Sequence, residues 1–364
     1  MAKRKKLGFI FGLIVIVGLC FQVIIRSGSF GPFIYQILFN PTIELKKENN
    51  QINILLLGIA GGTHEGPSLT DSIIFANVNT KNSAITLFSL PRDMWSTDLK
   101  GRINTAYAIG ESKRRGGGII LAKAEVEKIV GQNVDYAILI DFNGFIKAVN
   151  LLGGIDISIE RTFDDYEYPI EGKENDPCDN KPEDLEKLAS ASSQLETFPC
   201  RYLHIHFDKG STHMDGETAL RYVRSRHAKG EEGTDFARSK RQEKVINAFK
   251  DKMLSLQIII NPAKVIGLYQ TIEASVDTDI IQNEFDDFIK LAQRLQKAKM
   301  RSVVIDYGNK ETGRPGLLTH PLVSKEYNFE WTLIPRVGKD NYSEIQEYIN
   351  CELTKGNCII SQLP

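Results

Sequence analysis

The stretch that decides the fold reads INILLL at Ile52–Leu57, IIFANV at Ile73–Val78 and ITLFSL at Ile85–Leu90. All three are strand-like runs, and the polar segment Asn79–Ser83 between the last two is typical of a turn. Strands that read as mostly apolar runs favour a sheet covered on both faces, because a sheet with one face in water alternates apolar and polar residues. The stretch therefore predicts a buried central sheet.

Helices alternate with strands in the rest of the chain. Gly118–Val130 has apolar residues at helical intervals. The other expected elements, in chain order, are strand Val134–Ile140, helix Phe142–Leu152, strands Ile155–Ile159 and Tyr202–Phe207, a helix starting near Asp215, a helix from Asp235 to about Leu254, helices Pro262–Ser275 and Glu284–Ala298, strand Ser302–Ile305 and helix Tyr342–Leu353. This alternation predicts an α/β fold. Residues 160–200 are polar and acidic, and we expect a surface insertion there.

The N-terminus has the pattern of a membrane anchor. Four cations at residues 3–6 precede Leu7–Ile25, which contains no charge. About 19 residues at 1.5 Å rise match a hydrocarbon core of about 30 Å, and the cations favour a cytoplasmic N-terminus. We expect a cytoplasmic tail at 1–6, an uncleaved transmembrane signal anchor at 7–25, a spacer at 27–48 and the rest of the chain outside the membrane. The alternative is a cleaved signal peptide, although no A-x-A-like site follows.

Composition and cysteines limit the kinds of partner and compartment. The 364 residues carry a formal net charge of −1, so no overall basic excess points to a nucleic acid, and anion binding must come from local clusters. Four cysteines follow the anchor, and the pairs nearest in sequence, Cys178–Cys200 and Cys351–Cys358, are the expected disulfides of an exported domain. Free thiols are the alternative. A zinc site is disfavoured because the chain has no C-x-x-C pair.

Basic residues concentrate in residues 219–242. On a helix that begins at Asp235, Arg238 and Gln242 share a face that is polar at first and apolar further along. We expect both side chains to point into a cavity near the helix start, with Arg224 and Arg226 just before it in sequence. Several guanidinium groups around one cavity suit a pyrophosphate, because each can bind oxygens in pairs. The alternative is a solvated basic helix end.

A second polar cluster lies at strand ends. Asp71 precedes the run 73–78, and Arg92 and Asp93 follow the run 85–90. If the two strands pair as a hairpin, these residues share one edge of the sheet, where α/β proteins build ligand sites. A carboxylate there could hold Mg²⁺ on a phosphate or take a proton from an attacking hydroxyl. The alternative is a turn-capping Asp and a surface Arg–Asp pair.

Nine short blocks, in this order, resemble the LytR-CpsA-Psr family. They are LLLG at 55–58, LTDS at 69–72, SLPRD at 89–93, RINTAY at 102–107, VDY at 134–136, DFNGF at 141–145, LGGID at 152–156, DGETALRYVRSR at 215–226 and DFARSKRQ at 235–242. The resemblance implies an α/β/α sandwich with a central mixed sheet, preceded by one N-terminal transmembrane helix, and a deep apolar pocket for a lipid tail. It places the family domain at 49–275, with the insertion 160–200, and a C-terminal part at 276–364 that packs on the same domain.

The resemblance also implies an activity. Members are membrane-anchored phosphotransferases that move a glycopolymer, such as a teichoic acid or a capsule, from a polyprenyl-pyrophosphate carrier onto peptidoglycan. The expected partners are therefore the lipid-linked glycopolymer, the peptidoglycan acceptor and the membrane, and no nucleic acid. Two other functions remain open: a pyrophosphatase acting on the same lipid, or a non-catalytic receptor for lipid-linked polymers.

The family's site residues can be placed by position. Asp71 matches a metal-binding or catalytic carboxylate, with Mg²⁺ as the implied cofactor. The other implied residues are the pyrophosphate-contacting Arg92, Arg224, Arg226 and Arg238, the site glutamine Gln242, and Lys123 facing the phosphates. One position departs from the family pattern, because Ala60 stands where many members have an acidic residue. His64 or Glu65 could substitute for it.

Overall fold

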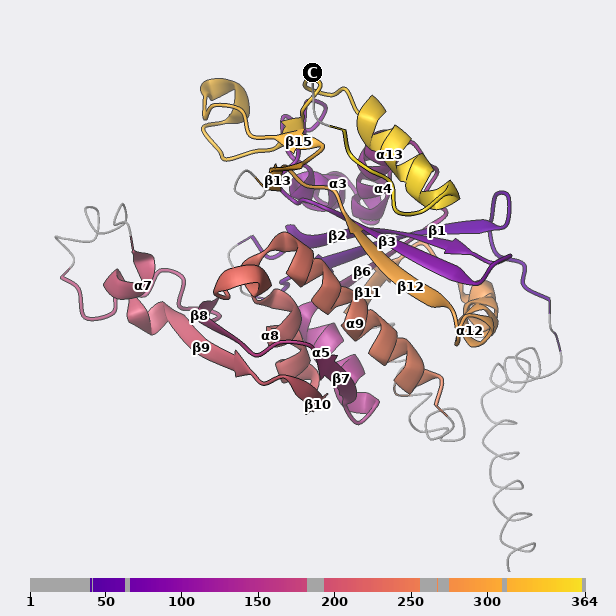
Figure 1. The fold of residues 1–364 in the computed structure, drawn as a ribbon, viewed down its shortest axis with the longest axis horizontal. Coiled ribbons are helices and arrows are strands. Elements are labelled where there is room, and N and C mark those ends of the chain that lie inside the picture. Colours follow the sequence, from indigo (N-terminus) through magenta and orange to yellow (C-terminus); the bar gives the residue numbers. More distant parts are fainter. Residues whose placement is uncertain are drawn as a thin grey trace, which may run out of the picture. The chain divides into compact units, whose positions relative to one another are not determined.

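Figure 1 shows the computed structural model of the chain, which describes residues 40, 42–62, 66–181, 193–255, 267, 275–309 and 313–361. The chain divides into two compact units. One comprises residues 1–46 and 281–295 and contains helix α12 (Phe285–Arg294), and the other comprises residues 47–280 and 296–364. Apart from the short turn η5, the elements described below belong to the second unit.

A six-stranded mixed sheet forms the centre of this unit. Its order is β11 (Val276–Thr278), β6 (Tyr136–Asp141), β1 (Gln51–Ile59), β2 (Thr70–Asn79), β3 (Ala84–Leu90) and β12 (Lys299–Val304). Strand β1 runs parallel to β6 and β3 parallel to β12, whereas the β1–β2, β2–β3 and β6–β11 pairs are antiparallel. The predicted mixed α/β architecture is therefore confirmed.

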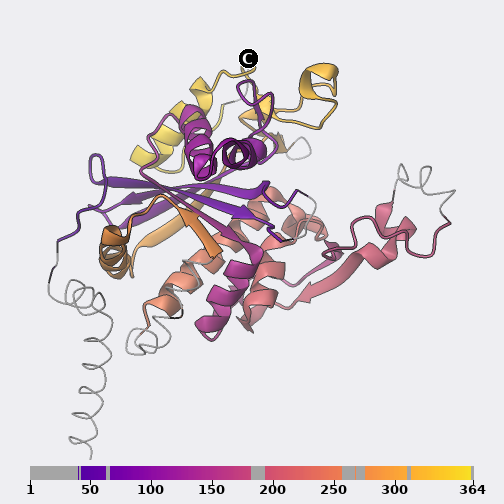
Figure 2. The same ribbon diagram turned by 180° about the vertical axis from the view of Figure 1, so that it is seen from behind.

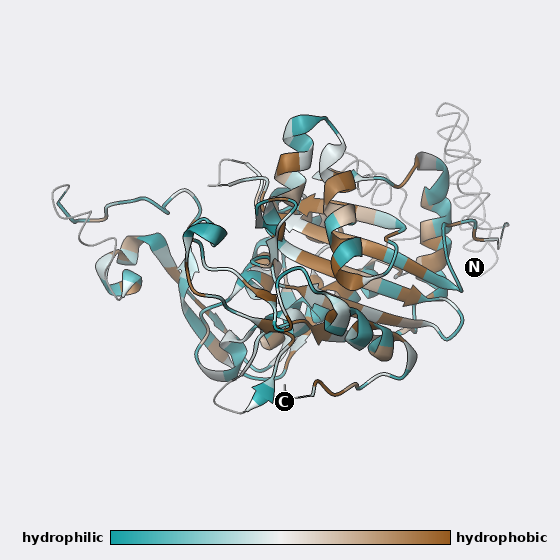
Figure 3. Cartoon of the chain, turned by 90° about the horizontal axis from the view of Figure 1, so that it is seen from above, coloured by the Kyte–Doolittle hydropathy of each residue, from teal (hydrophilic) through white to brown (hydrophobic). Residues whose placement is uncertain are grey.

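Helices cover both faces of the sheet (Figures 1 and 2). One layer contains α3 (Ala106–Lys113), α4 (Gly117–Val130) and α13 (Ser343–Thr354), and the other contains α5 (Phe142–Leu151), α8 (Gly216–Arg224) and α9 (Asp235–Met253). Hydrophobic residues follow the strands of the sheet (Figure 3). Phe75 and Phe88 are fully buried in a core shared with α4 and α13. Helices α3 and α4 approach so closely that a Cβ atom at Gly110 would lie 2.3 Å from the carbonyl oxygen of Gly117.

Between α5 and α8, the expected strands Ile155–Ile159 and Tyr202–Phe207 form, together with strands that the sequence did not predict. Strand β7 (Ile155–Ile159) pairs antiparallel with β10 (Gly210–Met214), outside the central sheet. Residues 160–200, expected to be an insertion, begin with strand β8 (Phe163–Pro169), which pairs with β9 (Tyr202–Phe207) in a hairpin that extends away from the sheet (Figure 1). Both disulfides, Cys178–Cys200 and Cys351–Cys358, form as expected.

Several smaller elements complete the described chain. They are the β4–β5 pair (Trp95–Ser96, Gly101–Arg102), α7 (Gln194–Thr197), the β13–β14 pair (Gly308–Asn309, Arg314–Pro315), the β15–β16 pair (Leu318–Thr319, Ile334–Pro335), and short 3-10 turns η1 (Ile103–Thr105), η3 (Pro199–Arg201), η4 (Gly230–Gly233), η5 (Gln282–Glu284) and η6 (Lys325–Tyr327). The sequence pattern did not predict α3.

Four expectations fall largely or wholly outside the described residues. They are the tail at 1–6, the anchor at 7–25, the spacer at 27–48 apart from residues 40 and 42–48, and the helix Pro262–Ser275 apart from Gly267 and Ser275. Among the residues that the structure describes, no helix has both the length and the apolar character needed to cross a bilayer.

Candidate functional site

One edge of the central sheet gathers the polar residues that flank β2 and β3. The register pairs Ile73 with Leu90, so Asp71 and Arg92 lie opposite each other just beyond this pair. The Arg92 guanidinium donates to the Asp71 carboxylate. The buried Asp93 accepts a 2.9 Å hydrogen bond from Arg102. The hairpin predicted from the sequence therefore brings a carboxylate and an arginine together at the strand ends.

Helix α9 begins beside this edge. It starts at Asp235, as expected, and its N-cap is Thr234, whose hydroxyl accepts from the Ala237 amide at 3.1 Å. Asp235 forms a 2.9 Å ion pair with Arg238 one turn later. Further along the same face, Gln242 Nε2 lies 3.1 Å from the Ser72 hydroxyl, beside Asp71. The predicted shared face of Arg238 and Gln242 does point toward the sheet edge.

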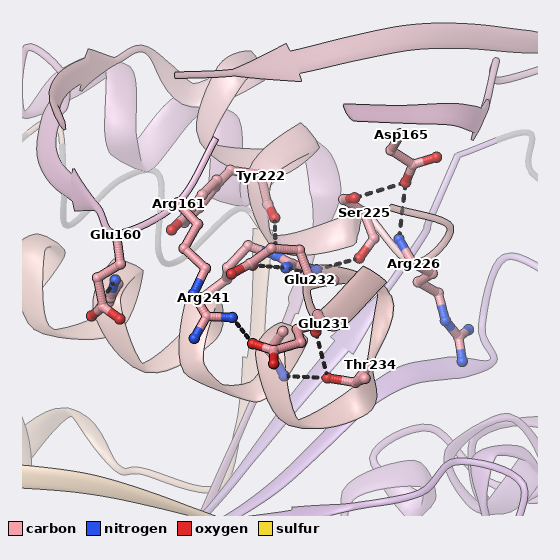
Figure 4. A network of polar contacts seen from close by, with 12 residues as sticks. Glu160, Arg161, Asp165, Tyr222, Ser225, Arg226, Glu231, Glu232, Thr234 and Arg241 are labelled. Atoms are coloured by element: carbon pink, nitrogen blue, oxygen red, sulfur yellow. Dashed lines mark hydrogen bonds and ion pairs between the residues drawn. The ribbon is translucent and has the colours of Figure 1, made fainter. Parts of the chain in front are cut away.

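The segment between α8 and α9 is fixed by two buried groups (Figure 4). Arg241, 2% exposed, donates to the carbonyl oxygens of Tyr222, Ser225 and Glu232 at 3.0, 2.7 and 2.9 Å. From the other side, Oδ2 of Asp165 accepts from the Ser225 hydroxyl at 2.7 Å. Arg241, although part of the basic stretch, therefore supports the backbone, and its burial keeps it from contacting a ligand.

Asp165 also holds the next two residues of this segment. Its Oδ2 atom accepts hydrogen bonds from the backbone amides of Arg226 and His227 at 3.1 and 3.2 Å. The Arg226 side chain points away from this network, as Figure 4 shows. The backbone of Arg226 is therefore anchored while its guanidinium extends elsewhere.

A cavity of about 580 Å³ lies where these elements meet. Its lining residues are Arg92, Asp93, Arg226, His227, Gly233, Thr234, Asp235, Phe236, Arg238, Asp306, Tyr307, Gly308, Arg314 and Trp331. The three aspartates among them each have an arginine partner. Its four arginines outnumber these aspartates, so the cavity carries excess positive charge and suits an anion.

Arg226 is the least compensated of these cations. Within the described parts of the chain, its guanidinium makes no hydrogen bond and no ion pair, although solvent reaches it through the cavity. Burial among the surrounding atoms, and then the neighbouring Arg238 and Arg92, lower the pKa of Arg226 to about 10. Arg226 is an exposed residue, so water also solvates its guanidinium. The group remains a cation at neutral pH, without an ion-pair partner among the described residues, and is free to pair with a bound anion.

Four of the expected site residues do not line this cavity: Asp71, Gln242, Arg224 and Lys123. Asp71 and Gln242 lie at the same sheet edge, where Asp71 binds Arg92 and Gln242 binds Ser72. Arg224 ends α8, stacks on the Phe142 ring at 4.2 Å and donates to the Tyr168 hydroxyl at 3.2 Å. Because Phe142 directly follows β6, Arg224 still lies near the same edge of the sheet. Lys123, on α4, pairs with Asp279 at 2.6 Å and lines a separate cavity of about 490 Å³. The structure does not bring Lys123 to the arginines, because α4 covers the opposite face of the sheet from α9.

Ala60 leaves the sheet edge with one fewer carboxylate. It is buried directly after β1, and the residues that could substitute, His64 and Glu65, lie outside the described residues. Asp71 keeps about a third of its side chain exposed, so it remains accessible to a cation.

The sequence pattern missed one wall of the cavity, which the C-terminal part supplies. Strand β12 runs parallel to β3, so Asp306 follows β12 at the edge where Asp93 follows β3. Asp306 binds both terminal nitrogens of Arg314. A signal was present, because an Asp shortly after an apolar strand is the same feature that singled out Asp93.

Comparison with known proteins places this geometry in a family. A family model described as the LytR_cpsA_psr family matches residues 36–315. Over 293 residues the chain is 28% identical to the polyisoprenyl-teichoic acid–peptidoglycan teichoic acid transferase TagV of Bacillus subtilis strain 168, covering 76% of this chain and 64% of that protein. Over 254 residues it is 27% identical to the polyisoprenyl-teichoic acid–peptidoglycan teichoic acid transferase TagU of Bacillus mycoides strain KBAB4, covering 68% and 66%. The chain thus spans slightly less than two thirds of both relatives.

A solved structure shows the same fold. The crystal structure of B. subtilis TagV matches with a TM-score of 0.53 at 24% identity, covering 84% of this chain and 98% of that one. Because the family model covers most of the chain, including both sheet-edge motifs and the start of α9, this protein belongs to the LytR_cpsA_psr family.

Proposed function

We propose that this protein is a transferase that moves a glycopolymer from a polyprenyl-pyrophosphate carrier onto peptidoglycan. The names of its TagV and TagU relatives describe such a transfer for teichoic acid. The observation that carries the proposal is the uncompensated Arg226 cation in a cavity that it shares with Arg92 and Arg238. Three guanidinium groups at one sheet edge suit a diphosphate, which offers many oxygens and more than one negative charge.

The proposed reaction is a displacement at phosphorus. A hydroxyl oxygen of a peptidoglycan sugar attacks the phosphorus that carries the glycopolymer. The bond from this phosphorus to the bridging oxygen breaks, and polyprenyl phosphate leaves. Arg92, Arg226 and Arg238 stabilise the negative charge that develops on the leaving phosphate. Arg224 is proposed to contact the diphosphate from the β6 side of the same sheet edge.

Asp71 is the proposed acid–base or metal-binding group, and Gln242 is proposed to hold the strand beside it through Ser72. Among the described residues, the one group of three potential metal ligands is Asp176, Cys178 and Cys200, whose cysteines form a disulfide. Mg²⁺ would therefore rely on Asp71 together with oxygens of the substrate, a common arrangement for this ion on phosphates. Bound there, Mg²⁺ would neutralise phosphate charge.

We further propose a single-pass protein of the cell membrane, with a cytoplasmic N-terminus and an extracytoplasmic transferase domain. The cations before residues 7–25 support this orientation. Two disulfides fit an oxidising compartment outside the cytoplasm. An anchor would also raise the effective concentration of a lipid-borne substrate at the site.

Transfer can be tested with the full chain purified in detergent. We expect it to move glycan from a polyprenyl-diphosphate oligosaccharide to a peptidoglycan oligomer, and to do so faster when Mg²⁺ is added. Asp71→Ala should abolish the Mg²⁺ response, because Asp71 is the carboxylate proposed to hold the ion. Phosphate release to water without an acceptor would instead identify a pyrophosphatase, and binding without turnover would identify a receptor. Either result would overturn the proposed transfer.

Anion binding can be tested separately by thermal unfolding. Inorganic pyrophosphate binds only the folded cavity, so at 100 times its Kd it should stabilise the protein by about 2.7 kcal/mol and raise Tm. The Tm of the Arg226→Ala variant should rise much less, because this variant lacks the unpaired cation that the anion neutralises. Arg221→Ala is the matched control, since Arg221 lies on α8, pairs with Glu217 and does not line the cavity. An equal rise in wild type and Arg226→Ala would contradict this role.

A further inference from the structure

Three exposed aromatic side chains line the arginine cavity. Phe236, Tyr307 and Trp331 are 59%, 52% and 45% exposed. They come from separate parts of the chain: the first turn of α9, the segment after β12, and the segment between η6 and β16. Large apolar groups gathered around one polar cavity are typical of a ligand surface.

The Trp331 ring is held in position. It lies 5.1 Å from the His320 ring, tilted by 30°, and meets the Tyr307 ring edge-on at 6.3 Å. His320 Nδ1 donates to the carbonyl oxygen of the buried Thr332 at 2.9 Å, which fixes the imidazole. The indole therefore packs against other rings on one side, and with 45% of Trp331 exposed it remains accessible to a ligand.

Polar groups lie beside these rings. Asp306 and Arg314, which bind each other through two hydrogen bonds, line the same cavity as Tyr307 and Trp331. A sugar ring matches such a surface, since its C–H face packs on an aromatic ring while its hydroxyls bond to charged groups. A purely apolar lipid tail would leave this ion pair desolvated without a partner in the ligand.

We propose that Trp331 and Tyr307 form a sugar-binding subsite for the donor, taking the sugar joined directly to its diphosphate. The inference rests on the proposed function, in which Arg226 and Arg238 hold that diphosphate. The first sugar is joined to the phosphorus through a single oxygen atom and must therefore lie beside the arginines, in the cavity that the two aromatic rings line. The acceptor glycan has no such attachment. The subsite makes Trp331 a specificity residue for the donor.

The chain allows a direct optical test. Its two tryptophans are Trp95, which is buried, and Trp331, so a ligand-induced change in indole fluorescence reports on Trp331. The purified full chain would be titrated with a short polyprenyl diphosphate, with the same lipid diphosphate carrying a disaccharide, and with a free peptidoglycan oligosaccharide. Calorimetry on the same ligands would give Kd for variants that lack the indole.

We expect Trp331→Ala to weaken binding of the disaccharide-bearing lipid by about tenfold, as for a lost aromatic contact. Binding of the sugar-free diphosphate should not change, and Trp331→Tyr should restore most of the loss. Phe329→Ala is the matched control, because Phe329 is an aromatic two residues away, 70% exposed and outside the cavity.

Each other outcome overturns the subsite. Equal weakening of both lipids would assign the rings to the diphosphate or the lipid tail. If Trp331→Ala weakened binding of the free oligosaccharide alone, the rings would belong to the acceptor site. If no Kd changed, Trp331 would have no binding role. If the wild type bound neither diphosphate, the proposed function itself would fail, whatever Trp331 does.

Discussion

Arg226→Ala should lower the rate of glycan transfer by about 100- to 1000-fold, the loss expected when one donor to developing charge is removed. The effect should appear in kcat as well as in KM for the donor. Arg226 contacts the bound diphosphate, and the charge on the leaving phosphate grows as the bond breaks. Stability should not fall. The guanidinium has no partner among the described residues, and the backbone amide that Asp165 holds is retained in the variant. Loss of activity with unchanged or slightly raised Tm is therefore the expected signature.

Two companion variants sharpen this result. Arg226→Lys keeps the charge but loses the planar fork, so it should recover only part of the rate. Arg221→Ala removes an arginine from α8 that pairs with Glu217, and it should leave transfer unchanged. A steady-state assay with the lipid-linked donor and peptidoglycan acceptor measures all three. Near-wild-type activity of Arg226→Ala would refute the proposed role. A loss of rate that is accounted for by a fall in the free energy of unfolding would refute it as well.

The central fold could be predicted because its signals are local. Strands β1, β2 and β3 read as apolar runs, and α4 repeats apolar residues at helical spacing. Strand β8 gave no such signal, since three of its seven residues are acidic. One of them, Asp165, is buried because it accepts backbone and side-chain hydrogen bonds from the segment before α9. A pattern of apolar residues cannot reveal a strand that buries a carboxylate.

The site was predictable only where neighbouring elements form it. Asp71 and Arg92 meet across a hairpin, and Arg238 and Gln242 share one helix face, so spacing along the chain was sufficient. Trp331 reaches the cavity through the parallel bridge of its neighbour Leu333 with Met94. Asp306 and its partner Arg314 reach it through the parallel pairing of β12 with β3, which are far apart in sequence. No local pattern specifies that pairing. For the same reason, helical spacing placed Lys123 on α4 but could not tell which face of the sheet α4 would cover.

Asp165→Ala should destabilise the protein by about 2–4 kcal/mol, because it removes a buried carboxylate that accepts several hydrogen bonds. Asp165 is 1% exposed, and its Oδ2 atom accepts from the Ser225 hydroxyl and from the amides of Arg226 and His227. Alanine would leave these donors without an acceptor, and each buried unpaired group costs about 1–3 kcal/mol. Denaturant unfolding measures the change. Asp164→Ala, at the next residue of β8, is the control, because the Asp164 carboxylate contacts the exposed His204 and His206 and should matter little.

Asp165 should also affect transfer, although it does not line the cavity, because it fixes the backbone from which Arg226 extends. A double-mutant cycle separates this positioning role from general destabilisation. At a temperature where all variants are folded, Asp165→Ala should lower kcat in the wild-type background. In the Arg226→Ala background it should lower kcat little further, since the group that it positions is gone, while the loss of unfolding free energy should be the same in both. If Asp165→Ala lowered kcat equally in the two backgrounds, Asp165 would act on transfer by a route other than Arg226.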